Sequence, residues 1–209
     1  MQILSVMQLG GPLMWAIFGL SILAGAIIIE RLVFFKKAWA EPEEVERKIA
    51  QAIYEGDRTR ASELARSRDS SLHRLFRVAI DHWAADAEAI KVLLEQERRR
   101  ELFRWERGLE MLSTIARVAP LLGLLGTVLG MVEVFRTIST GRGADMLYLA
   151  SGIWEALLTT VAGLSVAIPV VLAYAYLSSR VDMVEETLSR GADFILREKL
   201  LRGEGTRDA

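Results

Sequence analysis

The sequence predicts an all-α integral membrane protein with three transmembrane helices and long cytoplasmic helical extensions. Of its 209 residues, 52% are apolar, and the mean hydropathy is +0.26 although 25% of the residues are charged. The charges are segregated, because residues 1–29, 118–132 and 156–179 carry none. Such segregation is typical of membrane spans around a polar domain.

The first predicted span covers residues 13–35 and, with the segment before it, makes up region 1–35. Its apolar run is long enough to cross roughly 30 Å of hydrocarbon at about 1.5 Å per residue. No basic region precedes the run, and it is longer than the apolar part of a signal peptide, so we expect it to be retained. Trp15 and Trp39 lie near its ends, as interfacial aromatic residues often do.

Residues 36–111 are predicted to form a polar, helical, cytoplasmic domain. Three apolar stripes with helical spacing run through it, and we expect them to pack against one another. A turn is expected at Gly56-Asp57, after the first stripe. The stripes are Val45, Ile49 and Ile53; Leu72, Leu75, Phe76, Ala79, Ile80 and Trp83; and Ile90, Leu94, Leu102, Trp105 and Leu109.

The second predicted span covers residues 112–138, and we expect it to continue the preceding cytoplasmic helix without a break. Its charge-free stretch is shorter than the roughly 20 residues that a lipid-exposed span needs, so either its end charges snorkel or protein surrounds it. A periplasmic loop at 139–146 leads to the third span at 147–179. A C-terminal helix and tail follow at 180–209. One face of that helix carries Val181, Val184, Leu188 and Ala192.

The distribution of basic residues predicts the orientation in the membrane. Residues 36–107 hold sixteen Lys and Arg, whereas the connection between the second and third spans holds only Arg136 and Arg142. The positive-inside rule therefore places the polar domain and the C-terminus in the cytoplasm. The N-terminus and the short loop are then periplasmic.

Glu155, inside the third span, is the most informative single residue. A carboxyl within a membrane span costs several kcal/mol unless it is neutralised, paired or hydrated. On an ideal helix, Thr159 points within roughly 40° of the direction of Glu155, whereas Thr160 points about 140° away. The same strip also holds Ser151, Ala162, Val166 and Pro169.

The second span carries a face of small residues. Gly123, Gly126, Thr127 and Gly130 recur at i, i+3, i+4 and i+7, which allows close helix approach in a membrane. We expect these three glycines, with Gly163 and Pro169 of the third span, to serve helix packing.

Two interpretations of the polar residues remain open. In the first, the threonines only pack helices and Glu155 lies near the headgroups. In the second, Thr127, Glu155 and one or both of Thr159 and Thr160 line a hydrated path. One acid per chain does not make a transmembrane proton relay, so the second interpretation requires a titratable group from a partner subunit.

Composition argues against several other classes of protein. The net charge of −1 gives no bulk attraction to nucleic acid. The absence of cysteine excludes disulfides and thiolate sites, and two histidines, His73 and His82, make a poor metal site. We find no nucleophile-base pair and no phosphate-binding loop, so we expect no enzyme activity, no cofactor and no metal.

Two segments carry a family resemblance. Residues 119–131 (APLLGLLGTVLGM) and 152–169 (GIWEALLTTVAGLSVAIP) resemble the second-span and third-span signatures of the MotA/TolQ/ExbB proton-channel family. The likeness is to the ExbB and TolQ branch and extends over essentially the whole chain. One departure is Ala175 after Tyr174, where many relatives carry Asn.

The resemblance implies a subunit of a motor in the bacterial inner membrane, driven by the proton-motive force. It implies a homopentamer that encloses the single-span helices of two ExbD- or TolR-like subunits, each carrying an aspartate. A TonB- or TolA-like protein would transmit the work to the envelope. Position by position, Glu155, Thr127 and Thr160 match the family's polar pore-facing residues, and Thr159 is a further candidate.

Two other functions remain as alternatives. The chain could be a non-conducting membrane scaffold of an envelope complex, in which case Glu155 would be dispensable. It could also be a flagellar-type stator, although such members usually have four spans and this sequence predicts three. The threonines and the carboxyl suit sodium as well as protons, and the sequence does not identify the envelope process that is served.

Overall fold

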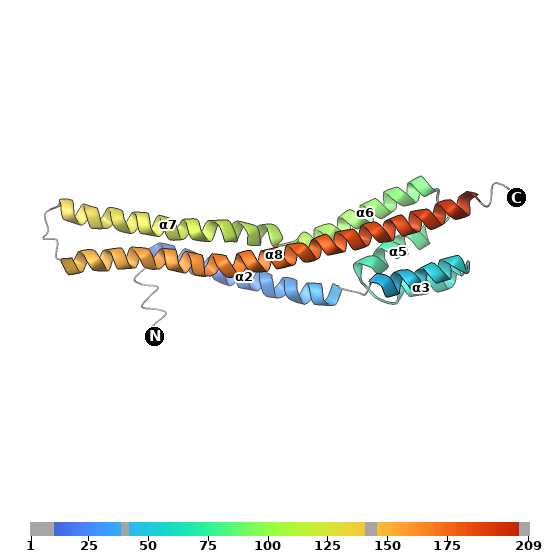
Figure 1. Ribbon diagram of the computed structural model, residues 1–209, viewed down its shortest axis with the longest axis horizontal. Coiled ribbons are helices and arrows are strands. Elements are labelled where there is room, and N and C mark those ends of the chain that lie inside the picture. The colour runs from blue at the N-terminus through green and yellow to red at the C-terminus, as the bar shows by residue number, and fades with distance from the viewer. Residues whose placement is uncertain (1–10, 39–41, 141–145, 205–209) are drawn as a thin grey trace. The chain divides into compact units, whose positions relative to one another are not determined.

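A computed structural model describes residues 11–38, 42–140 and 146–204 (Figure 1). Almost all of these residues are helical, and none of them lies in a strand. By its internal contacts the chain divides into two units. The first comprises Met1–Arg31 and Gly108–Leu177, and the second comprises Leu32–Arg107 and Ser178–Ala209.

Three helical stretches in the described part are long and apolar enough to cross a membrane. They lie within Gly11–Lys36, Ala87–Ser139 and Leu149–Leu201. At most 28% of the most apolar part of any of them is buried within the chain. Most of that surface is therefore available to lipid or to other subunits, and the predicted fold class is confirmed.

The first unit is built from three helices. It contains most of α2 (Gly11–Ala38), all of α7 (Leu109–Ser139) and the first part of α8 (Met146–Glu204). Pro120 lies inside α7 and Pro169 inside α8, and both helices continue through them. Trp39, residues 1–10, most of the predicted 139–146 loop and the end of the C-terminal tail lie outside the described residues.

The second unit contains the end of α2, four shorter helices and the C-terminal part of α8. The four shorter helices are α3 (Pro42–Tyr54), α4 (Arg58–Arg66), α5 (Ser71–Asp81) and α6 (Ala87–Glu106). The starts of α4, α5 and α6 have N-caps, because Asp57, Ser70 and Asp86 each accept a hydrogen bond from the backbone N–H three residues on. Such caps satisfy donors that the first turn of a helix leaves free.

The apolar stripes predicted from the sequence form the core of this unit. Ile49, Leu75 and Ile90 are each no more than 1% exposed, and Trp105 is likewise buried. The face of α8 predicted after residue 180 is also buried at Val181, Val184 and Leu188. The predicted turn at Gly56 is confirmed, because Gly56 follows the end of α3 with a φ of +77°.

The prediction that the second span continues the cytoplasmic helix without a break is wrong. α6 ends at Glu106, Arg107 is non-helical, and Gly108 has a φ of +81° before α7 begins. This left-handed conformation strains any residue with a Cβ, and a Cβ on Gly108 would also lie 3.2 Å from Cγ2 of Ile27. Arg107 and Gly108 therefore separate the two helices, at the border between the two units.

Candidate functional site

Helices α7 and α8 pack against each other in antiparallel fashion through small residues. An ideal Cβ placed on Gly130 would lie 2.6 Å from Cβ of Ala156, and one on Gly163 would lie 2.5 Å from the carbonyl oxygen of Ala119. A Cβ on Gly126 would overlap the side chain of Thr159. The glycines thus allow a close approach of the two helices that alanine would prevent. In a membrane, the van der Waals packing that results takes the place of the missing hydrophobic driving force.

Two hydroxyls meet one carbonyl at the centre of this pair. Thr160 Oγ1 donates to the carbonyl oxygen of Gly123 at 2.9 Å, and Thr159 Oγ1 lies 3.2 Å from the same oxygen. Thr159 Oγ1 also lies 2.7 Å from the carbonyl oxygen of Ala156 in its own helix, so its single proton has two acceptors. Thr159 is only 3% exposed, whereas Thr160 is half-buried.

Thr127 is placed differently. Its hydroxyl donates to the carbonyl oxygen of Leu124, one turn back in α7, at 2.6 Å. The side chain is half-buried, and its oxygen keeps the capacity to accept further hydrogen bonds. Across the described residues, no hydrogen bond joins Thr127 to Glu155 or to either threonine of α8.

Glu155 precedes Ala156, the residue that packs against Gly130. Its side chain is partly exposed, and within the described ranges it makes no hydrogen bond or ion pair. The strip predicted around it does not share one environment, because Thr159 is buried between the helices whereas Ser151 and Pro169 are exposed. The structure therefore brings Thr159 and Thr160 together on Gly123 and leaves the Glu155 carboxyl outside that cluster.

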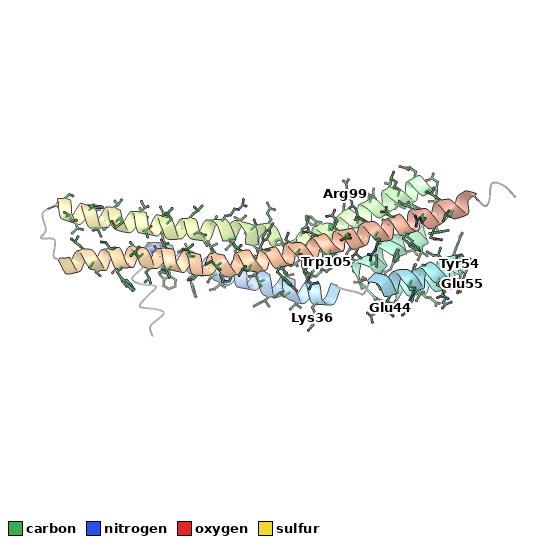
Figure 2. The ribbon with its side chains drawn as sticks, viewed as in Figure 1. Lys36, Glu44, Tyr54, Glu55, Arg99 and Trp105 are labelled. Atoms are coloured by element: carbon green, nitrogen blue, oxygen red, sulfur yellow. The ribbon has the colours of Figure 1, made fainter. Side chains whose placement is uncertain are left out.

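The second unit contains a buried polar network that the sequence pattern did not predict. The Glu101 carboxyl is fully buried and accepts hydrogen bonds from Nε and Nη2 of Arg74 at 2.8 and 2.7 Å. Arg104 adds a third contact at 2.9 Å. Trp105 Nε1 donates to Ser71 Oγ at 2.8 Å, and Ser71 in turn bonds Glu101 (Trp105 is labelled in Figure 2).

This network changes the pKa of the Glu101 carboxyl. Burial alone would raise the pKa of Glu101, but hydrogen bonds from Arg74, Ser71 and Arg104 outweigh burial and lower the pKa. A signal for the network was present in the sequence. Glu97 and Glu101 occupy the same helical stripe as Ile90, Leu94 and Trp105, and acids on a buried stripe require partners.

No group of three His, Asp or Glu side chains in the described parts of the chain could hold a metal ion. The candidate residues of the α7–α8 pair offer one partly exposed carboxyl, that of Glu155, and the three hydroxyls of Thr127, Thr159 and Thr160. Such groups hold water and exchange protons, and ionisable residues inside membrane segments mark ion or substrate pathways.

Comparison with known proteins finds several relatives of this chain. The chain is 36% identical over 174 residues to a putative ExbB-like biopolymer transport protein of Synechocystis, a match that covers 81% of this chain and 68% of the relative. It is 33% identical over 177 residues to the Tol-Pal system protein TolQ of Haemophilus influenzae, covering 79% and 78%. Biopolymer transport protein exbB1 of Vibrio cholerae is 28% identical over 193 residues, covering 88% and 83%.

Residues 67–190 match the family described as the MotA/TolQ/ExbB proton channel family. That segment is more than half of the chain and contains α7 and the membrane part of α8. With three apolar helices and relatives of the ExbB and TolQ type, the chain is a multi-pass membrane subunit of the Tol/Exb kind. The chain belongs to the MotA/TolQ/ExbB proton channel family.

Proposed function

We propose that the chain is the channel-forming subunit of an inner-membrane motor driven by the proton-motive force. Five copies would surround the single-span helices of two ExbD- or TolR-like subunits. A TonB- or TolA-like protein would carry the resulting motion to an envelope process. The named relatives, an ExbB-like transport protein and a TolQ of the Tol-Pal system, support this assignment.

The proposal rests mainly on the surroundings of Glu155. The residue lies in a membrane segment whose next 24 residues, 156–179, carry no charge, and it has no partner among the described residues. An acid in such a place requires water or a partner from another chain. An aspartate on an enclosed partner helix would supply the second titratable group that a proton path needs.

The placement of the hydroxyls suggests a division of roles. Thr127 and Glu155 are partly exposed and would face the pore, where they hydrate the path and tune proton exchange on the partner aspartate. Thr160 would lie at the edge of the path, because it is half-buried and its proton is committed to Gly123. We assign Thr159, which is almost fully buried between α7 and α8, to helix packing.

Assembly into a pentamer would use the apolar surface that one chain leaves open. Large side chains on α7 and α8, among them Leu121, Val128 and Leu172, are at least half exposed in the single chain. In this arrangement α7 and α8 line the pore and α2 faces lipid. The excess of Lys and Arg in residues 36–107 supports a cytoplasmic second unit and a periplasmic N-terminus.

The test is ion flux in proteoliposomes that contain this chain and its single-span partner. A pH-sensitive dye would report proton uptake under an imposed potential. Glu155→Gln and Thr127→Val are expected to reduce the flux while the assembled complex stays intact. Glu133→Gln is the matched control, because Glu133 is an exposed acid of α7 that pairs with Arg136 at its periplasmic end.

The competing function is a scaffold that conducts no ions. It predicts no flux in any version and normal cellular function of the Glu155→Gln protein. Repeating the assay with a sodium gradient and a sodium-sensitive dye distinguishes sodium from protons. A flagellar-type stator is tested separately by topology tagging, which should find three spans with a cytoplasmic C-terminus.

A further inference from the structure

A small cavity lies in the second unit where α3 meets the segment that joins α4 to α5. Its volume is about 110 Å³, well above the roughly 10–15 Å³ that one water molecule needs. Its polar lining consists of Glu44, Lys48, Ser67, Arg68 and His73. Glu44, which is labelled in Figure 2, lies on the side of the cavity that α3 forms.

His73 on the wall of this cavity is 96% buried and only partly satisfied. Its Nδ1 lies 2.7 Å from Oγ of Ser70, the residue that caps α5. The other ring nitrogen makes no hydrogen bond to any described residue. It is not among the buried side-chain atoms without a partner, so it keeps contact with solvent and is accessible to a ligand.

Among the side chains that the structure describes, the charges around His73 leave a positive surplus. Lys48 is paired with Glu44 at 2.5 Å, but Arg68 has no carboxylate within ion-pair distance among the described residues. Nε of Arg77 is buried without a hydrogen-bond partner in the same part of the structure. Burial lowers the pKa of His73, and Arg68, Arg77 and Arg74 lower it further, whereas only Asp69 opposes them.

We propose that this cavity binds a small anion that carries a phosphate group, held by Arg68 and Lys48 and by a hydrogen bond from His73. A guanidinium presents paired N–H donors that match phosphate oxygens, and an ammonium adds a point charge. An anion offsets the surplus of positive charge and gives the buried imidazole a partner for its free nitrogen. The source is either free phosphate or the phosphoryl headgroup of a lipid.

The two histidines of the chain make the test direct, since a protein labelled with ¹³C at histidine Cε1 gives only two ring signals. His82, which is exposed and bonds the Val78 carbonyl oxygen, serves as the internal reference. Inorganic phosphate is added to the full-length protein in detergent, with chloride at equal ionic strength as the comparison. In a second arm the protein sits in nanodiscs with or without phosphatidic acid, and no free phosphate is present.

The expected result is a saturable shift of the His73 signal alone, with a rise in its pKa. Arg68→Gln should weaken binding by at least about tenfold, because it removes a charge-assisted contact. Arg58→Gln, on an exposed arginine outside the cavity, should leave binding unchanged, and circular dichroism confirms that both variants are folded. A shift with inorganic phosphate identifies a free anion, and one seen only with phosphatidic acid identifies a headgroup.

The proposal is overturned if neither source gives a saturable shift, if chloride acts equally, or if Arg68→Gln binds as the wild type does. The measurement involves no ion flux. Its outcome is therefore independent of whether the chain conducts protons.

Discussion

Thr160 Oγ1 donates a hydrogen bond across the helix pair to the carbonyl oxygen of Gly123, 2.9 Å away, and Thr159 reaches the same oxygen at 3.2 Å. Two hydroxyls thus serve one acceptor. Either one can keep the carbonyl satisfied when the other is lost, and Thr159 has a second acceptor in Ala156.

This redundancy predicts how substitutions combine. Thr159→Val and Thr160→Val should each destabilise the helix pair by about 0.6 kcal/mol and by no more than about 1.7 kcal/mol. The double variant should lose more than the sum of the two, because only then is the interhelical contact to Gly123 lost entirely. Unfolding in detergent measures the three values, and strict additivity would show that the hydroxyls act independently.

The close approach of α7 and α8 predicts a strong effect of a single methyl group. In Gly126→Ala the new Cβ overlaps Thr159, so we expect a loss of about 1–3 kcal/mol from overpacking. Gly25→Ala is the control, since nothing lies within 4 Å of a Cβ at that position of α2. The control should be neutral or slightly stabilising, because alanine favours helix over glycine. Equal thermal stability of the two variants would contradict the packing described here.

The two most perturbed acids of α6 should differ in their importance for stability. Glu101 is fully buried, and removing it in Glu101→Ala leaves Arg74 partly unpaired, at an expected loss of about 3–5 kcal/mol. Hydrogen bonds from Arg98 and Arg99 lower the pKa of Glu95 to about 2. Glu95 is nonetheless largely solvated, so Glu95→Ala should cost less than about 1 kcal/mol. Denaturant unfolding of both variants gives the comparison, and a larger loss for Glu95 would refute it.

Stability should fall in two steps as the pH is lowered. The pKa of His73 lies below its ordinary value of 6.5, so the unfolded chain takes up a proton first and stability declines as pH falls below about 6.5. The pKa of Glu101 lies below 4.5, so its contribution is complete above that pH and is lost as pH falls through the lowered value.

A histidine variant separates these two steps. His73→Gln should remove the decline below about pH 6.5 and leave the acid step in place. His82→Gln should keep both steps, because His82 is exposed. Melting temperatures measured across the pH range decide the matter, and an unchanged profile in His73→Gln would assign the first step to another group.

Much of the fold could be predicted because hydrophobic periodicity reports burial directly. Leu75, Ile90 and Leu188 lie in the core as their spacing indicated. The break at Gly108 was missed because one glycine in a periodic pattern is compatible with a continuous helix. Only the positive φ of Gly108 distinguishes the two cases, and sequence spacing does not report it.

The site was harder to predict than the fold. The spacing of Gly123, Gly126 and Gly130 indicated a face for close packing, but not the residue that each glycine would meet. On an ideal helix Thr159 and Thr160 point 100° apart, so the sequence indicated different surroundings for them. In the structure both hydroxyls reach the carbonyl oxygen of Gly123, which lies between the two directions. Among the described residues Glu155 has no hydrogen-bond or ion-pair partner, and no pattern in this sequence identifies one.

The central claim is that the Glu155 side chain contacts water inside the membrane in the assembled protein. The chain has no cysteine, so single cysteines at 155, 159 and 154 can be labelled without background. A membrane-impermeant maleimide applied to the assembled complex should react with Glu155→Cys, while Thr159→Cys, buried between helices, stays protected. Trp154→Cys, on an exposed apolar face, should be shielded by lipid or a neighbouring subunit. Reaction at 155 alone is the predicted result, whereas a position 155 as unreactive as 154 would contradict a hydrated path and leave the scaffold as the better account.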